Sequence, residues 1–124
     1  MSSAENTDDE TIFRETTERF WLLRLVTEVR GDGVNVRLHP VQCSFRRIPA
    51  AQIRDVNATS YAGTAYGGWH WGVRRTPNGN TVYRLRGGQG VEVERTNGER
   101  WFIGSQRPTE LQSAIERICT PDEF

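Results

Sequence analysis

The stretch LRLVTEVRGDGVNVRLHP, residues 23–40, contains two runs of alternating side chains around a glycine-rich turn. In the first run, positions 23, 25, 27 and 29 alternate with positions 24, 26, 28 and 30, and this period of two is typical of a half-buried strand. Apolar residues alternate again over 34–38, after the turn Gly31-Asp32-Gly33. The stretch therefore predicts a β-hairpin whose second strand ends at Pro40.

Shorter patterns of the same kind continue along the chain. A third strand is expected from about Cys43 to Ile48, then one helical turn near 51–53 and a strand from Val56 to Tyr61. Later strands are expected near 69–74, 81–86, 91–94 and 101–104, because the turn sequences TPNGN, GGQG and TNG separate them.

The segment YGGWHWGVRR, residues 66–75, mixes aromatic residues with arginines. Strand alternation places Trp69, Trp71 and Val73 on one face and His70 and Arg74 on the other. We expect the tryptophan face to belong to the core, which disfavours a base-stacking surface for single-stranded nucleic acid.

The period changes only at the C-terminus. Leu111, Ala114, Ile115 and Ile118 mark one face of a helix that has Pro108 at its first position and ends before Pro121. Such an apolar stripe needs a surface to cover it. The predicted fold is therefore mainly β (α+β): a small, bent antiparallel sheet or partly closed barrel of about seven strands, capped by one C-terminal helix.

Length and charge suggest one domain with polar ends. The 124 residues suffice for one core. Residues 1–19 carry six acidic residues against two arginines and are predicted to form an acidic tail, with the domain at 20–120 and a C-terminal tail at 121–124. Seven arginines and one acidic residue lie within 43–86, and a basic zone of this kind attracts anions.

The cellular compartment of the protein is inferred from its cysteines and from its hydropathy. Cys43 and Cys119 are far apart and form neither a disulfide framework nor a metal motif. The sequence contains no apolar run of the roughly 18 residues that a membrane span requires. Its N-terminus is acidic rather than signal-like. We therefore expect a cytoplasmic protein in a reducing compartment.

The segments EVRGDGVNVRLHP and FRRIPAAQI resemble the first three strands of prokaryotic pleckstrin-homology-like (PH-like) domains. YGGWHWGVRR, GGQGVEVERTNGERWFIGSQRP and TELQSAI are similar to the later part of a small family of that type, and the resemblance covers about 22–119. In such relatives a segment like FRETTERF precedes a transmembrane hairpin, which this chain lacks. The resemblance implies a PH-like barrel that binds rather than catalyses.

No residue pattern predicts an enzyme, a cofactor or a metal site. His39 and His70 have no ligand partners at a useful spacing, and no serine stands in a nucleophile elbow. The GGQG turn is followed by neither a helix nor a lysine, so it is not a phosphate loop. We therefore expect a non-catalytic binding module.

Two kinds of binding are compatible with these residues. The favoured one is a protein partner or a second copy of the chain, docked along a sheet edge. The alternative is an anionic ligand or an acidic membrane surface, bound by arginine pairs. The candidate ligand-binding residues are Arg46, Arg47, Arg74, Arg75, His70 and Tyr66.

Overall fold

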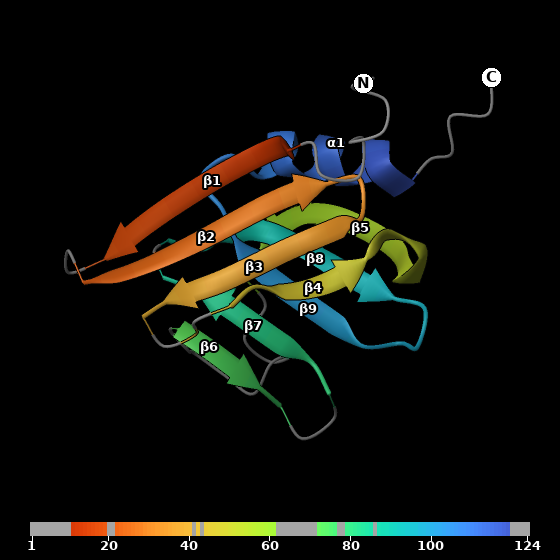
Figure 1. The fold of residues 1–124 in the computed structure, drawn as a ribbon. Helices are drawn as coiled ribbons and strands as arrows, with labels where there is room; N and C mark the ends of the chain where they lie inside the picture. The colour runs from red at the N-terminus through yellow and green to blue at the C-terminus, as the bar shows by residue number, and fades with distance from the viewer. Residues whose placement is uncertain are drawn as a thin grey trace.

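The computed structural model describes residues 11–19, 22–40, 42, 44–61, 72–76, 79–85 and 87–119. In these residues, nine strands form two sheets, and one helix follows them (Figure 1). The first sheet has the order β1 (Thr11–Arg19), β2 (Leu23–Arg30), β3 (Gly33–His39), β4 (Arg46–Pro49). The second has the order β5 (Ile53–Ser60), β8 (Gln89–Arg95), β9 (Arg100–Gly104), β7 (Thr81–Arg84), β6 (Gly72–Arg75). A 3-10 turn, η2 (Ala50–Gln52), joins β4 to β5, and α1 spans Pro108–Cys119.

The predicted class, mainly β with one C-terminal helix, is confirmed. The predicted hairpin is the antiparallel pair β2–β3, and the turn at 51–53 is η2. The sheets do not close into a barrel: β1–β4 and β5–β9 are two separate hydrogen-bonded sheets. No helix among the described residues is long and apolar enough to cross a membrane.

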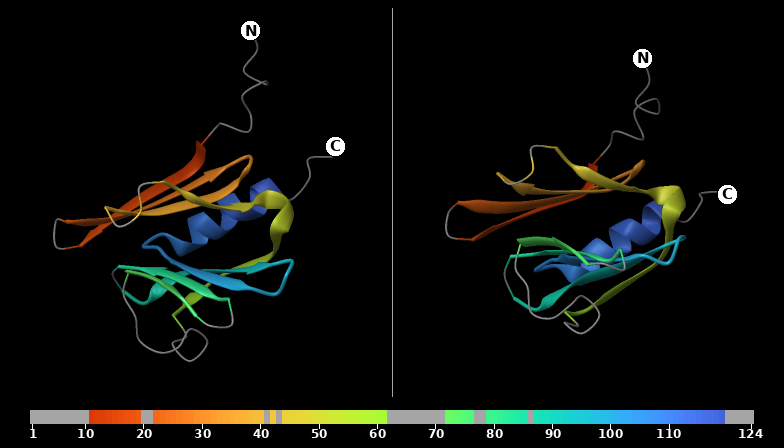
Figure 2. Two further views of the ribbon diagram at one scale, coloured as in Figure 1. Left: turned by 60° about the horizontal axis from the view of Figure 1, so that its bottom comes forward. Right: turned by 90° about the horizontal axis from the view of Figure 1, so that it is seen from below.

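The helix packs between the two sheets, as both views in Figure 2 show. It contacts β1, β2 and β3 of the first sheet and β5 and β8 of the second. Leu111, Ala114 and Ile115 are the buried positions, as their spacing predicts, and Ile118 is partly buried against the same core. The helix therefore covers its apolar face by closing one side of the space between the sheets.

The first strand lies outside the boundary that the sequence predicts. Thr11–Arg19, expected as part of an acidic tail, pairs antiparallel with β2, and its Phe13, Glu15 and Thr17 are buried. Two of these three inward positions are polar, so the sequence of this strand does not show the alternation of apolar and polar residues that identifies a half-buried strand. The domain therefore begins at least nine residues earlier than the predicted residue 20.

Glu15 owes its buried place to two hydrogen bonds with the segment before α1. Ser105 Oγ donates to Glu15 Oε1 at 2.6 Å, and the backbone N–H of Gln106 donates to Glu15 Oε2 at 2.8 Å. Both donors stabilise the carboxylate where it is shielded from water. This contact ties β1 to the start of the helix.

The second sheet departs from the antiparallel arrangement that the sequence predicts. β7 pairs in parallel with β9, in the register Thr81↔Trp101, so β9 lies between β7 and β8. Turn signals predict the hairpins β6–β7 and β8–β9, and both pairs form. Turn sequences predict which strands form a hairpin, but they do not predict which strands of two hairpins pair with each other in the sheet.

We expect Glu15→Ala to lower the free energy of unfolding by about 2 kcal/mol, because it leaves two donors without their acceptor. Glu18→Ala on the same strand is the control: its side chain is 60% exposed and lies 3.5 Å from Arg24, a surface pair worth about 0–1 kcal/mol. Urea unfolding of both variants tests this. Equal losses in the two variants would show that the Glu15 contacts do not hold β1.

Candidate functional site

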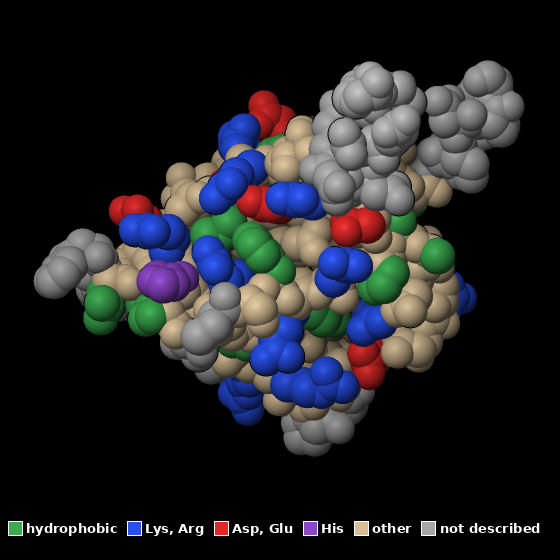
Figure 3. Space-filling view, in the orientation of Figure 1, with side chains coloured by type: hydrophobic (Ala, Val, Ile, Leu, Met, Phe, Trp, Pro, Cys, Tyr) green, Lys and Arg blue, Asp and Glu red, His purple; other side chains and the backbone are tan. Residues whose placement is uncertain are grey.

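A cavity of about 360 Å³ lies where β4 of the first sheet faces β6, β7 and β9 of the second. Figure 3 shows several basic side chains in the region where these strands lie in Figure 1. The lining residues are Gln42, Arg46, Arg47, Val73, Arg75, Thr81, Tyr83 and Trp101. Three cations and no carboxylate stand among them.

Strand register explains why these residues share a face of the second sheet. Arg75 pairs with Thr81 across β6–β7, and Thr81 pairs with Trp101 across β7–β9. Val73 pairs with Tyr83 one step along, on the same face. The parallel β7–β9 pair therefore places Trp101 beside Thr81, on the face that Arg75 and Tyr83 share.

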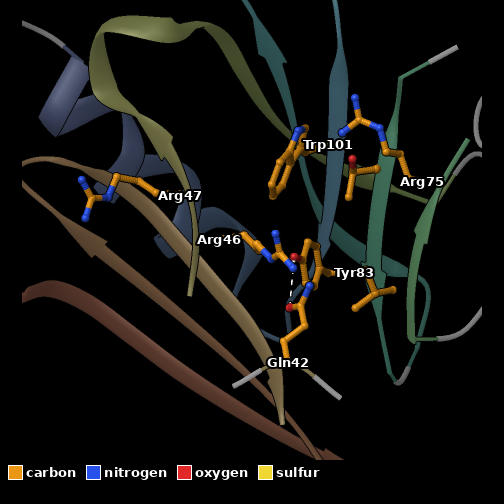
Figure 4. Close-up of a pocket in the computed structure, with 8 residues that line it drawn as sticks. Gln42, Arg46, Arg47, Arg75, Tyr83 and Trp101 are labelled. Atoms are coloured by element: carbon orange, nitrogen blue, oxygen red, sulfur yellow. Dashed lines mark hydrogen bonds between the residues drawn. The ribbon is translucent and has the colours of Figure 1, made fainter. Parts of the chain in front are cut away.

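Two stacked aromatic rings form the floor of the cavity. The rings of Tyr83 and Trp101 have their centroids 5.6 Å apart at 22°, and the residues are only 1% and 6% exposed. Tyr83 donates its hydroxyl hydrogen to Gln42 Oε1 at 3.2 Å (Figure 4). Burial raises the pKa of Tyr83, against the opposing effects of Gln42 and the Arg46 charge, so the phenol stays neutral at pH 7.

The predicted pair Arg46 and Arg47 is divided by strand alternation. Arg46 lies on the same face of β4 as the buried Ile48, and Figure 4 shows it extending toward Tyr83, whereas Arg47 extends away. Arg47 donates from Nε to Asn35 Oδ1 at 3.2 Å, and its Nη2 lies 3.6 Å from Asp32. Among the described residues, Arg46 has neither an ion pair nor a hydrogen bond through its side chain.

The predicted pair Arg74 and Arg75 is divided in the same way. Arg75 lines the cavity with a side chain that is 64% exposed, and its Nη2 lies 3.4 Å from Glu99. Glu99 is shared, because Arg95 lies 3.6 Å from its other oxygen. Arg74 lies on the opposite face of β6 and does not line the cavity.

The remaining two predicted site residues have no described position. His70 and Tyr66 lie outside the described residues, as do Trp69 and Trp71. Gln42, Thr81, Tyr83 and Trp101 line the cavity without having been predicted as ligand-binding residues. Tyr83 and Trp101 are buried, and their places on the neighbouring strands β7 and β9 put them at the end of the core beside the cavity.

Two polar atoms of the lining residues are buried without a partner. Within the described part of the chain, Thr81 Oγ1 and Trp101 Nε1 have no hydrogen-bond partner, although the two residues are only 5% and 6% exposed. A buried polar group that is not hydrogen-bonded costs about 1–3 kcal/mol.

Guanidinium, amide, hydroxyl and aromatic groups line the cavity. The described residues that line it include no histidine, cysteine or carboxylate, so they provide neither an acid–base pair nor metal ligands. Groups of three or more metal-ligating side chains are likewise lacking in the residues that the structure describes. Arginine guanidinium groups, an amide and a neutral phenol bind anions and polar groups by hydrogen bonds.

We expect Thr81→Val to raise the free energy of unfolding by about 1 kcal/mol, because it replaces an unpartnered buried hydroxyl with a methyl group. Thr76→Val is the matched control: Thr76 is also buried, but its Oγ1 accepts the backbone N–H of Asn80 at 3.1 Å. That variant should lose about 1 kcal/mol. Urea unfolding measures both, and a destabilised Thr81→Val would mean that its hydroxyl is used within the folded chain.

Comparisons of the chain with protein-family models, with curated proteins and with solved structures find no match. The geometry of the cavity itself therefore carries the proposal below.

Proposed function

We propose that this chain is a non-catalytic binding module whose ligand places an acidic group in the cavity between β4 and β6–β7–β9. The observation that carries this proposal is Arg46: it extends over a buried aromatic floor, and it has no ion-pair partner among the described residues. A cation beside apolar surface binds an anion more strongly than one surrounded by water, because the local dielectric constant is lower.

Arg75 supports Arg46 from the other side of the cavity. Its guanidinium is held near Glu99, which also neutralises Arg95, so one carboxylate serves two cations. An incoming phosphate or carboxylate would receive charge-assisted hydrogen bonds from both β4 and β6. The acidic group would thus join the two sheets at the side that α1 does not close.

The wider family proposal rests on architecture. Strand-rich sheets followed by one C-terminal helix support a PH-like module, whereas the parallel β7–β9 pair departs from the antiparallel arrangement expected of it. A cytosolic location is proposed from the cysteines: Cys119 is a free thiol, and burial, with Glu116 nearby, raises its pKa and keeps it protonated.

We expect inorganic phosphate to bind saturably at low ionic strength, and Arg46→Ala to weaken that binding at least fivefold, about 1 kcal/mol. Arg117→Ala is the control, since it removes the same charge from an exposed position on α1 that does not line the cavity. Isothermal titration calorimetry with the intact chain measures both variants. The affinity should fall as salt rises, because the cavity opens to solvent.

Three outcomes distinguish the proposal from its alternatives. Equal weakening in Arg46→Ala and Arg117→Ala would show that only net charge matters. Absence of saturable phosphate binding would overturn the site. Pelleting with vesicles containing anionic lipid, abolished by Arg46→Ala and retained in Arg117→Ala, would identify the acidic group as a lipid headgroup.

A docked protein strand is the second candidate function. β1 is nine residues long and forms an edge of its sheet, with no described strand beyond it. Arg107 covers part of this edge, because its Nη2 donates to the carbonyl of Arg14 at 2.9 Å. Light scattering over a range of concentrations tests pairing between copies, and a dimer that Arg107→Ala strengthens would favour this candidate over the cavity.

A further inference from the structure

We infer that Gln42 is a second ligand-binding side chain of the cavity, and that it makes the site select oxyanions whose oxygen atoms carry no proton, such as a sulfate group. This inference rests on the proposed function, since it takes Arg46 as the cation that binds the acidic group. It adds the chemical class of that group, and it depends on which hydrogen-bonding atoms of the lining side chains remain open.

The side-chain amide of Gln42 is held in one orientation. Its Oε1 accepts the backbone N–H of Leu38 at 3.2 Å and the hydroxyl hydrogen of Tyr83 at 3.2 Å. The amide cannot be turned over, because a backbone N–H only donates and would then face the NH₂ group. The backbone N–H of Gln42 also donates to the carbonyl of Leu38 at 2.7 Å. Oε1 is therefore used within the chain.

The NH₂ group of Gln42 is left for a ligand. Gln42 lines the cavity and is half-buried, and among the described residues its Nε2 has no hydrogen-bond partner. Figure 4 shows Gln42 and Arg46 both extending toward Tyr83. Burial raises the pKa of Tyr83 while the Arg46 charge lowers it, so the guanidinium lies within electrostatic reach of the same phenol. The amide and the guanidinium thus supply donors to one end of the cavity.

The accessible polar groups of the described lining side chains are donors. Arginine has no acceptor, and the open part of Gln42 is its NH₂ group. The two lining hydroxyls belong to Tyr83 and Thr81, which are only 1% and 5% exposed, and no carboxylate stands among the described lining residues. Glu99 lies outside the lining, and its two oxygens face Arg75 and Arg95.

A site that only donates distinguishes anions of equal charge by their protons. Every oxygen of a sulfate ion accepts hydrogen bonds, whereas hydrogen phosphate carries one hydroxyl group. Placed against Arg46 or Gln42, that hydroxyl would set one donor against another, so hydrogen phosphate binds only in the orientations that turn its hydroxyl to solvent. Phosphate binding is weakened by this restriction but is not abolished, as the proposed function requires.

The experiment compares sulfate with inorganic phosphate by calorimetry on the intact chain at low ionic strength and about pH 8, where both are dianions and phosphate keeps one proton. Sulfate should bind at least threefold more tightly, and Arg46→Ala should weaken both anions. Gln42→Glu should reverse the preference. The new carboxylate still accepts from Leu38 and Tyr83 and repels both anions, but only phosphate can donate to it.

Gln89→Glu is the matched control, because it adds the same charge at an exposed position on β8 that does not line the cavity. This variant should keep the sulfate preference. A second pair of ligands tests the parent protein without any substitution: at about pH 5, methyl sulfate and methyl phosphate are both monoanions, and only methyl phosphate carries a proton. Methyl sulfate should again bind at least threefold more tightly.

Each other result has a defined meaning. Equal binding within both pairs, weakened by Arg46→Ala, would overturn the inference and leave the proposed function standing. Absence of binding by all four anions would overturn both. A sulfate preference that Gln42→Glu leaves unchanged, or that Gln89→Glu also reverses, would show that Gln42 does not select the ligand and would overturn the inference.

Discussion

Buried side chains from both sheets and from α1 pack into one continuous hydrophobic core, and the limits of this core determine the rest of the structure. On one side, Leu111 and Ile115 of α1 are completely buried between the sheets. On the other side, the described residues contain no helix, and the core ends at Tyr83 and Trp101. A cavity forms there because two twisted sheets that are held apart by a helix on one side do not meet on the other.

The same core explains which features of the fold the sequence predicts. The hairpin at 23–40 and the helix carry strong periodicity, because their buried positions are apolar. β1 carries little, because Glu15 and Thr17 occupy two of its inward positions, and a carboxylate becomes an inward residue only when Ser105 and Gln106, some ninety residues away, supply donors. The parallel β7–β9 pair is also not predictable from local sequence. Each of the two hairpins that it joins has a turn signal, but no local signal shows which strands of the two hairpins lie next to each other.

The candidate site shows the corresponding limits for function. Sequence reasoning finds the two arginine pairs, and strand alternation alone predicts that neighbours in a pair face opposite sides. Strand alternation does not show which face of β4 or of β6 is turned toward the opposite sheet. The structure turns Arg46 and Arg75 toward one cavity, while Arg47 is engaged with Asn35 and Asp32. Gln42 is missed because a single glutamine in a loop carries no pattern, although it accepts hydrogen bonds from Tyr83 and from the backbone of Leu38.

Net charge says little about such a site. The chain has 16 basic and 16 acidic residues, yet a charge in solution at physiological salt acts only over about 8 Å. The local balance around the cavity therefore decides whether an anion is attracted. Some arginines elsewhere in the described structure face carboxylates, as Arg14 and Arg30 do at Glu28. Arg46 instead extends toward Tyr83 (Figure 4), and within the described residues its side chain has no ion pair and no hydrogen bond. Among the described cations that line the cavity, Arg46 is the one that the fold leaves without a carboxylate or a hydrogen-bond acceptor, so it is the group with which an anionic ligand would pair.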